Sequence, residues 1–193
     1  MNINNNINNN VNEEYKWDNS VCRTNWSNEC ENLVNKQILL EYEASINYHT
    51  LFAYFDNSDV SLNNIANFFN KSSLEEREHA HKFIEYQNKR GGKVVIKNLE
   101  NIINLNYNIN NNNVLKAFEL ALKMEKDIYK NLLLLHKQSE DDNDPQFCDF
   151  LESEYLNEQI ESINEISKYI TKLKMIGDNG HGIWNFDNNF NLN

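Results

Sequence analysis

The fold class of this chain is decided by residues 62–89, which read LNNIANFFNKSSLEEREHAHKFIEYQNK. Apolar residues recur in this stretch every three to four positions, which is the period of a helix and not of a strand. One face of the predicted helix carries Ile65, Phe69, Ser72, Glu76, His79, Phe83 and Tyr86. Most of this stripe is apolar, but a carboxylate and an imidazole interrupt it.

Three further segments have the same period, at about residues 28–55, 114–138 and 145–175. Five glycines and one proline leave little to build the tight turns of a β fold, and Gly91-Gly92 and Asp144-Pro145 are the strongest internal breakers. The sequence therefore predicts an all-α protein, a four-helix bundle with helices about 40 Å long. The link over residues 90–113 is long enough to cross the whole bundle, so that the second and third helices can run parallel.

The two ends of the chain differ from this pattern. Residues 1–20 are rich in asparagine and are expected to form a disordered tail, which leaves residues 21–193 as one domain. A second asparagine cluster, residues 104–113, is expected to be a loop insertion. Near the C-terminus Ile183, Trp184, Phe186 and Phe190 indicate a short fifth helix, which Gly180 and Gly182 weaken.

Composition limits the partners and the compartment. A net charge of −11 and a pI near 4.9 argue against nucleic acid, which requires a basic surface. No segment approaches the roughly 18–20 apolar residues of a membrane span, and the first residues lack the features of a secretory signal. Cys22, Cys30 and Cys148 form neither a disulfide framework nor a metal motif. Together these features predict a cytoplasmic protein with no membrane partner.

Polar residues on the inward stripes are the informative feature. Glu41, Glu76 with His79, Glu125 and Gln159 lie on the inward faces of four different segments. A buried carboxylate needs a cation or a network of donors, and inward Glu with Glu-x-x-His is a known route to a diiron site in a bundle. A single Glu-x-x-H is more often a solvated face, and Tyr48 is more often an ordinary core aromatic.

Longer motifs add a family resemblance. They are Ser72-Ser73-Leu74-Glu75-Glu76-Arg77-Glu78-His79-Ala80, Gln87-Asn88-Lys89-Arg90-Gly91-Gly92, Glu125-Lys126, Leu135-His136-Lys137, Asn143-Asp144-Pro145, Cys148-Asp149-Phe150 and Tyr155-Leu156-Asn157-Glu158-Gln159. In this order and spacing, over roughly residues 21–176, they resemble ferritin of the eukaryotic type. The resemblance implies a ferritin-like bundle with a long crossover connection.

The resemblance also implies a set of site residues. Residues matching Glu41, Glu76 and His79 hold the first iron in the heavy-type subunit, and Glu76 bridges to a second iron held with Glu125, with Gln159 nearby. Tyr48 matches the tyrosine beside that centre. The implied catalytic set is thus Glu41, Tyr48, Glu76, His79, Glu125 and Gln159, with two irons per subunit.

Other positions match metal-binding acids away from this centre. Asp149 and Glu152 match carboxylates of the threefold pore, although acids near a helix start are also ordinary surface residues. Glu75 and Glu78 match inner-surface acids that take part in iron transit or mineral nucleation, but His81 replaces a glutamate often found there.

The expected function is that of an iron-storage subunit. It would oxidise Fe(II) with O2 and store Fe(III) as a mineral in a cage of twenty-four subunits, alone or mixed with other ferritin subunits. Two alternatives stay open: a non-catalytic storage subunit, and a metal-free helical interaction module.

Overall fold

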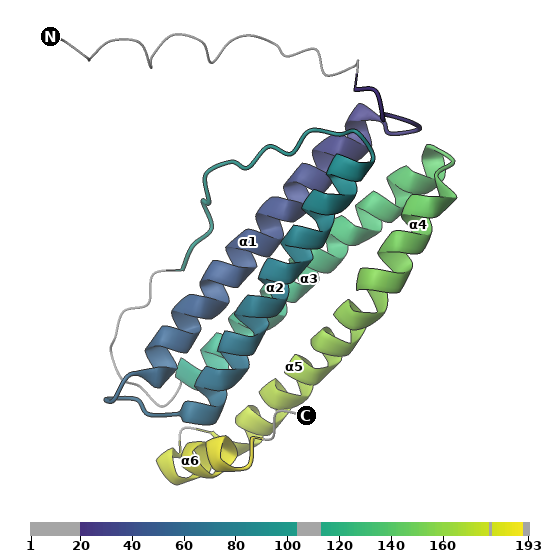
Figure 1. Ribbon diagram of the computed structural model, residues 1–193. Coiled ribbons are helices and arrows are strands. Elements are labelled where there is room, and N and C mark those ends of the chain that lie inside the picture. The colour runs from purple at the N-terminus through teal and green to yellow at the C-terminus, as the bar shows by residue number, and fades with distance from the viewer. Residues whose placement is uncertain (1–19, 104–112, 178, 191–193) are drawn as a thin grey trace, which may run out of the picture.

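The computed structural model describes residues 20–103, 113–177 and 179–190 (Figure 1). These residues contain α1 (Asn28–Asp56), α2 (Asn63–Lys89), α3 (Asn113–Asp141), α4 (Pro145–Leu151), the π-helical turn η2 (Glu152–Leu156), α5 (Asn157–Ile176) and α6 (Gly180–Asn188), and no strand. The predicted all-α fold and its four long helices are confirmed. The tail over residues 1–19 and most of the asparagine cluster, residues 104–112, lie outside the described residues.

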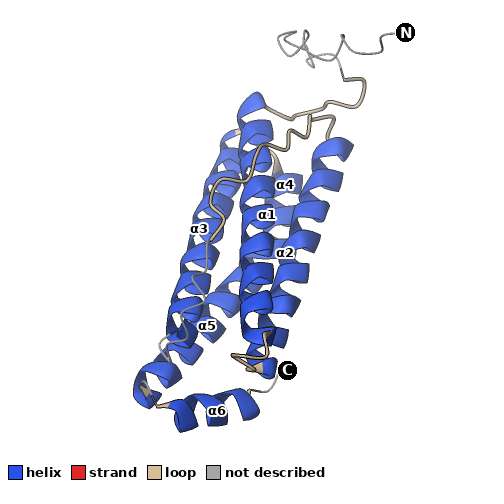
Figure 2. Cartoon of the chain, turned by 90° about the vertical axis from the view of Figure 1, so that its left-hand side faces the viewer, coloured by secondary structure: helices blue, strands red, loops and turns tan. Residues whose placement is uncertain are grey.

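Two helical hairpins make up the bundle. Helices α1 and α2 form the first, and α3 with the continuous helix α4–η2–α5 forms the second. Figures 1 and 2 show α2 and α3 running in the same direction, as the long link predicted. Among the described helices, none has both the length and the apolar character needed to span a membrane.

The returning segment is held as a strap, residues 93–103, along the outer face of α1 (Figure 2). Asn35, Glu43 and Asn47 lie on that face of α1 and make the attachments. Their partners are backbone groups of Lys93, Val95, Glu100, Asn101 and Ile103, at 2.8–3.2 Å. Because the strap contributes mainly peptide groups, its path is set by side chains of the helices, three from α1 and Gln87 from α2, which donates to the carbonyl of Lys93.

The turn η2 keeps the fourth long helix in register with the core. Phe147, Leu151, Tyr155 and Gln159 are all buried and follow one another at intervals of four. Four residues of an ordinary α-helix overshoot a full turn by about 40°, so three such steps would carry the last side chain out of the core. A wider π turn absorbs the excess and leaves Tyr155 and Gln159 both facing inward.

The short fifth helix, α6, forms despite its glycines. Asn179 caps it by accepting a hydrogen bond from the N–H of His181 at 3.1 Å. Ile183, Phe186 and Phe190 are buried against the end of their own bundle. Phe190 lies 4.6 Å from the ring of Tyr169.

α6 also completes the start of α2. The buried carboxylate of Asp187 accepts hydrogen bonds from the N–H groups of Asn64 (3.1 Å) and Ile65 (2.9 Å) through Oδ1. Since Leu62 provides no side-chain cap, Asp187 satisfies two donors that the first turn of α2 would otherwise leave unpaired.

The cap predicts a graded effect of substitution. Asp187→Ala should lower the free energy of unfolding by about 1 kcal/mol, because it removes the acceptor, whereas Asp187→Asn should lose much less. Thermal melting of the two variants beside the parent measures the difference. Equal losses in both variants would mean that the charge of Asp187, and not its hydrogen bonds, stabilises this end.

Candidate metal centre

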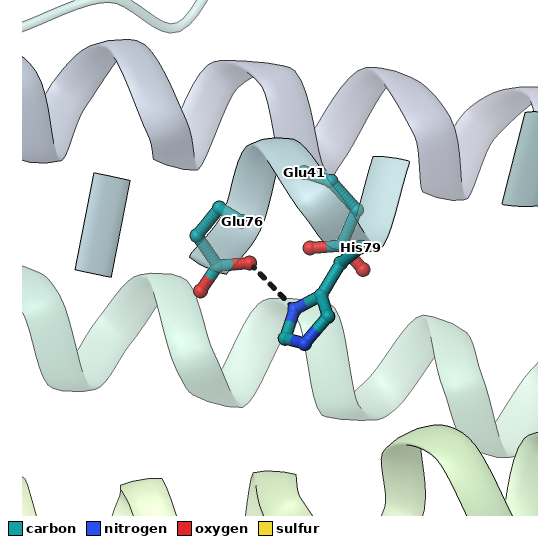
Figure 3. A group of neighbouring side chains, drawn as sticks. All are labelled: Glu41, Glu76 and His79. Carbon is teal, nitrogen blue, oxygen red and sulfur yellow. Dashed lines mark hydrogen bonds and ion pairs between the residues drawn. The ribbon is translucent and has the colours of Figure 1, made fainter. Parts of the chain in front are cut away.

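The inward carboxylates of the first hairpin meet in the middle of the bundle. Glu41 comes from α1, and Glu76 and His79 come from one face of α2 (Figure 3). One ligand atom from each of the three lies within 4.8 Å of the others. Glu41 is 0% exposed, Glu76 5% and His79 9%. Such a group of two carboxylates and one imidazole has the composition of a metal site.

Each nitrogen of the His79 ring faces a carboxylate. Nδ1 lies 3.4 Å from Glu76 Oε2, and Nε2 lies 3.4 Å from Glu158 Oε2 on α5. The hydroxyl of Tyr155, in η2, donates to the backbone carbonyl of His79 at 3.2 Å. The imidazole therefore lies between carboxylates of α2 and α5, and η2 holds the backbone of the same residue.

The second hairpin brings Glu125 to the same level. This carboxylate of α3 is 4% exposed and accepts one hydrogen bond at each oxygen, from the hydroxyl of Tyr48 and from the amide of Gln159. The Gln159 amide also donates to the backbone carbonyl of Glu125 at 3.1 Å. A cavity of about 50 Å³ is lined by Glu76, His79, Glu125 and Gln159, among others.

The electrostatics of the centre are unfavourable without a cation. Burial raises the pKa of Glu41 and of Glu76, the charge of Glu76 raises that of Glu41 further, and the charge of Glu125 raises that of Glu76 further. Burial also raises the pKa of Glu125, although hydrogen bonds from Tyr48 and Gln159 oppose it. A metal ion would remove this repulsion directly.

His79 supplies part of the missing positive charge. Burial acts to lower its pKa, but the hydrogen bond to Glu158 and the charge of Glu41 outweigh burial, and the pKa is raised. The same hydrogen bond lowers the pKa of Glu158. Among the described residues that line the 50 Å³ cavity, His79 is the one basic side chain.

Comparison with known proteins shows the family. The profile of the ferritin-like domain matches residues 31–176. The chain belongs to the ferritin family. It is 48% identical over 168 residues to a chloroplastic ferritin of Malus baccata var. xiaojinensis (87% of this chain, 67% of the relative). It is 46% identical over 170 residues to ferritin-2 of Zea mays, also chloroplastic (88% and 68%), and 46% identical to a chloroplastic ferritin of Phaseolus vulgaris (87% and 66%).

Two consequences follow from these relatives. The chain spans about two thirds of their length. Their names also contradict the cytoplasmic location expected from composition, because all three are chloroplastic ferritins. That expectation was wrong because an acidic, cysteine-poor composition is equally compatible with other reducing compartments.

The remaining predicted acids of the ferritin pattern lie outside the central cluster. Glu75 and Glu78 are exposed on α2, and Glu75 pairs loosely with Lys71 at 3.7 Å. Asp149 and Glu152 are exposed near the start of the fourth long helix, where Glu152 Oε1 lies 2.7 Å from His136 Nε2. Glu75 nevertheless lines the same cavity as Glu76 and His79, whereas Glu78, Asp149 and Glu152 do not.

Sequence analysis gave no role to Glu158, which contacts His79. Glu158 directly precedes the inward Gln159 in the sequence. A helix position next to an inward one ordinarily faces solvent, so its place in the sequence indicates a surface residue. The contact joins α2 to α5, and the packing of one helix against another is not visible in the periodicity of either.

The buried charge of Glu41 predicts that a neutral side chain at this position stabilises the metal-free chain, by an amount that depends on pH. The pKa of Glu41 is raised above its ordinary 4.5, so the carboxyl group destabilises the folded, metal-free chain as pH rises above that value. Glu41→Gln should therefore raise the melting temperature at about pH 8 more than at about pH 5, since glutamine is neutral at both.

Thermal melting after chelator treatment measures this effect, with Glu29→Gln as the control, an exposed carboxylate on the same helix as Glu41. Equal melting temperatures for Glu41→Gln and the parent across this pH range would contradict the electrostatic account.

Proposed function

We propose that this chain is a catalytic, heavy-type ferritin subunit that oxidises Fe(II) with O2 and stores the Fe(III) product. Membership of the ferritin family supports iron storage, iron as the metal and assembly into an oligomeric cage. The ferroxidase reaction, a centre for two irons and a cage of twenty-four subunits are the further parts of the proposal. The centre consists of Glu41, Glu76, His79, Glu125 and Gln159.

One observation carries this proposal: the buried carboxylates of Glu41 and Glu76 group with one imidazole, and a third buried carboxylate, Glu125, lines the same cavity as Glu76 and that imidazole. Carboxylate oxygens with one or two nitrogens suit iron, and such sites keep open positions for oxygen. Glu76 belongs to both parts of the centre, since it groups with Glu41 and His79 and also lines the cavity that Glu125 and Gln159 line. It is therefore the side chain best placed to serve two ions.

The side chains of the centre would have different roles toward the iron substrate. Two Fe(II) ions held side by side can each give one electron to the same O2 molecule. Carboxylate oxygens favour the harder Fe(III) product, whereas the amide of Gln159 is a weaker ligand and would let that product leave. Tyr48 holds Glu125 from the other side through its hydroxyl.

The two alternatives make different demands. A non-catalytic storage subunit does not need the full ligand set, which is present here, and a metal-free interaction module leaves the buried carboxylates unneutralised. Aerobic addition of Fe(II) to the purified protein separates them when O2 uptake, oxidation rate and particle mass are followed together. Rapid uptake by a cage supports the proposal. Mineral growth without rapid uptake supports the storage subunit. The absence of both mineral growth and rapid uptake supports the interaction module.

The bridging role of Glu76 predicts a large loss of rate. Glu76→Ala, with or without His79→Ala, should nearly abolish rapid Fe(II) oxidation while the cage still assembles, because the shared ligand is removed from both irons. Stopped-flow oxidation and particle mass measure the two properties. Glu85→Ala, an exposed carboxylate on the same helix, is the matched control. A Glu76→Ala variant that oxidises iron at the parent rate would refute the site.

The pore assignment belongs to the same proposal. In a cage, Asp149 and Glu152 would line the threefold pores and attract Fe(II) to the interior. Both are exposed in the single subunit, as residues of a shared opening must be. Glu75 and Glu78 would act on the inner surface, in transit or nucleation.

The pore predicts a salt-dependent effect. Asp149→Asn with Glu152→Gln should slow oxidation most at low ionic strength, where charge steering is least screened, and leave the centre intact. Initial rates across a salt series test it. The control is Asp127→Asn with Glu119→Gln, two half-exposed acids of α3. Identical salt dependence in the two double variants would make Asp149 and Glu152 ordinary surface residues.

The compartment follows the relatives. Their names favour a plastid, since each of the three is chloroplastic. Fractionation of cells that express the protein would test this inference.

A further inference from the structure

Two buried amide side chains lie behind Glu41, between α1 and α3. Gln37 is 0% exposed and Asn131 is 2% exposed. Gln37 Nε2 donates to Glu41 Oε1 at 2.6 Å, and Asn131 Nδ2 donates to Gln37 Oε1 at 2.7 Å. The three side chains therefore form a line of hydrogen bonds that crosses from one hairpin to the other and ends at the centre.

The order of donors and acceptors along this line is fixed by a backbone carbonyl, which can only accept a hydrogen bond. Asn131 Nδ2 also lies 3.4 Å from the backbone carbonyl of Leu33, which can only accept. The NH2 group of Asn131 must therefore face α1, so that Gln37 presents its oxygen to Asn131. Gln37 is then left with its own NH2 group toward Glu41, and no other assignment of the two amides satisfies all these contacts.

The line occupies one oxygen of Glu41 and leaves the other free. Within the described part of the chain, Glu41 Oε2 has no hydrogen-bond partner although the side chain is fully buried. This free oxygen belongs to the carboxylate that groups with Glu76 and His79. We propose that Gln37 and Asn131 are positioning residues, which hold Glu41 so that Oε2 alone is offered to the metal. This inference rests on the proposed function, because it takes the centre to bind iron.

A gain in folding stability does not explain the presence of Asn131 in this line of hydrogen bonds. Asn131 Oδ1 is buried and has no partner among the described residues. A buried acceptor without a donor costs free energy, and an aliphatic side chain of similar size would avoid that cost. An amide at position 131 is therefore better explained by what it does to Gln37 than by packing.

The test measures metal binding apart from iron oxidation. Co(II), whose visible absorption reports its ligands, is titrated anaerobically into the metal-free assembled protein. The variants are Gln37→Met, Asn131→Leu and their combination, all of which keep the volume and remove hydrogen bonds. Gln87→Met is the matched control, because Gln87 is also fully buried and also donates to an acceptor, the carbonyl of Lys93 at 2.9 Å, but lies two helical turns beyond His79.

The expected result is a specific loss of affinity. Gln37→Met should weaken Co(II) binding by about 10-fold or more, the usual effect of losing a group that orients a ligand. Asn131→Leu should weaken it less, because Gln37 remains but can turn. The double variant should match Gln37→Met, since Asn131 acts only through Gln37. In the oxidation assay KM for Fe(II) should rise while kcat stays near that of the parent.

Other results overturn the proposal in recognisable ways. Parent-like Co(II) affinity in Gln37→Met, an equal loss in Gln87→Met, or additive losses in the double variant would each refute the positioning role. If the parent takes up O2 with iron and Gln37→Met does so with unchanged KM, the proposed function stands and the inference fails. If the variants lose Co(II) affinity as expected but the parent takes up no O2, the inference stands and the ferroxidase function fails.

Discussion

Repulsion among the buried carboxylates of Glu41, Glu76 and Glu125 is the constraint to which the rest of the structure responds. Each of the three is nearly inaccessible to water, and burial raises the pKa of each. The side chains around them are mostly donors, from Gln37, Tyr48 and Gln159. These donors place the oxygens without neutralising them, so the centre retains an attraction for a cation that ordinary packing would have removed.

Such a centre contributes little to stability, and the bundle compensates at its two ends. Two aromatic clusters flank the centre. The cluster toward α6 consists of Tyr48, Phe55, Phe68, Phe69, Phe118 and Phe190, and the cluster toward α4 consists of Trp26, Phe83, Tyr86, Phe147, Phe150 and Tyr155. The rings within each lie about 4–6 Å apart, where aromatic pairs attract beyond their burial. The three carboxylates therefore occupy one layer of the bundle, between two aromatic clusters.

The sequence predicted those features that depend on periodicity. The four long helices, their ends to within a few residues and the inward faces of Glu41, Glu76, His79, Glu125 and Gln159 all follow from the spacing of apolar residues. The turn η2 did not, because four-residue intervals such as Phe147–Leu151–Tyr155 also occur in straight helices. Glu158 and Asn131 were missed since their contacts join different elements. α6 was underestimated because its stability comes from Asp187 and the bundle end, and not from its own composition.

The strap over residues 93–103 bears on how this chain can change over evolutionary time. Its attachments to α1 are made chiefly through peptide groups, which every amino acid except proline provides in full. Substitutions at the exposed positions of the strap should therefore leave these attachments in place, whereas Val94 and Ile103, which pack against the core, and Asn35, Glu43 and Asn47 are less free to vary. A mutational bias toward one amino acid could thus accumulate in the connection without disturbing the helices, and the divergence of related chains should concentrate in the strap while the three positions of α1 that hold it persist.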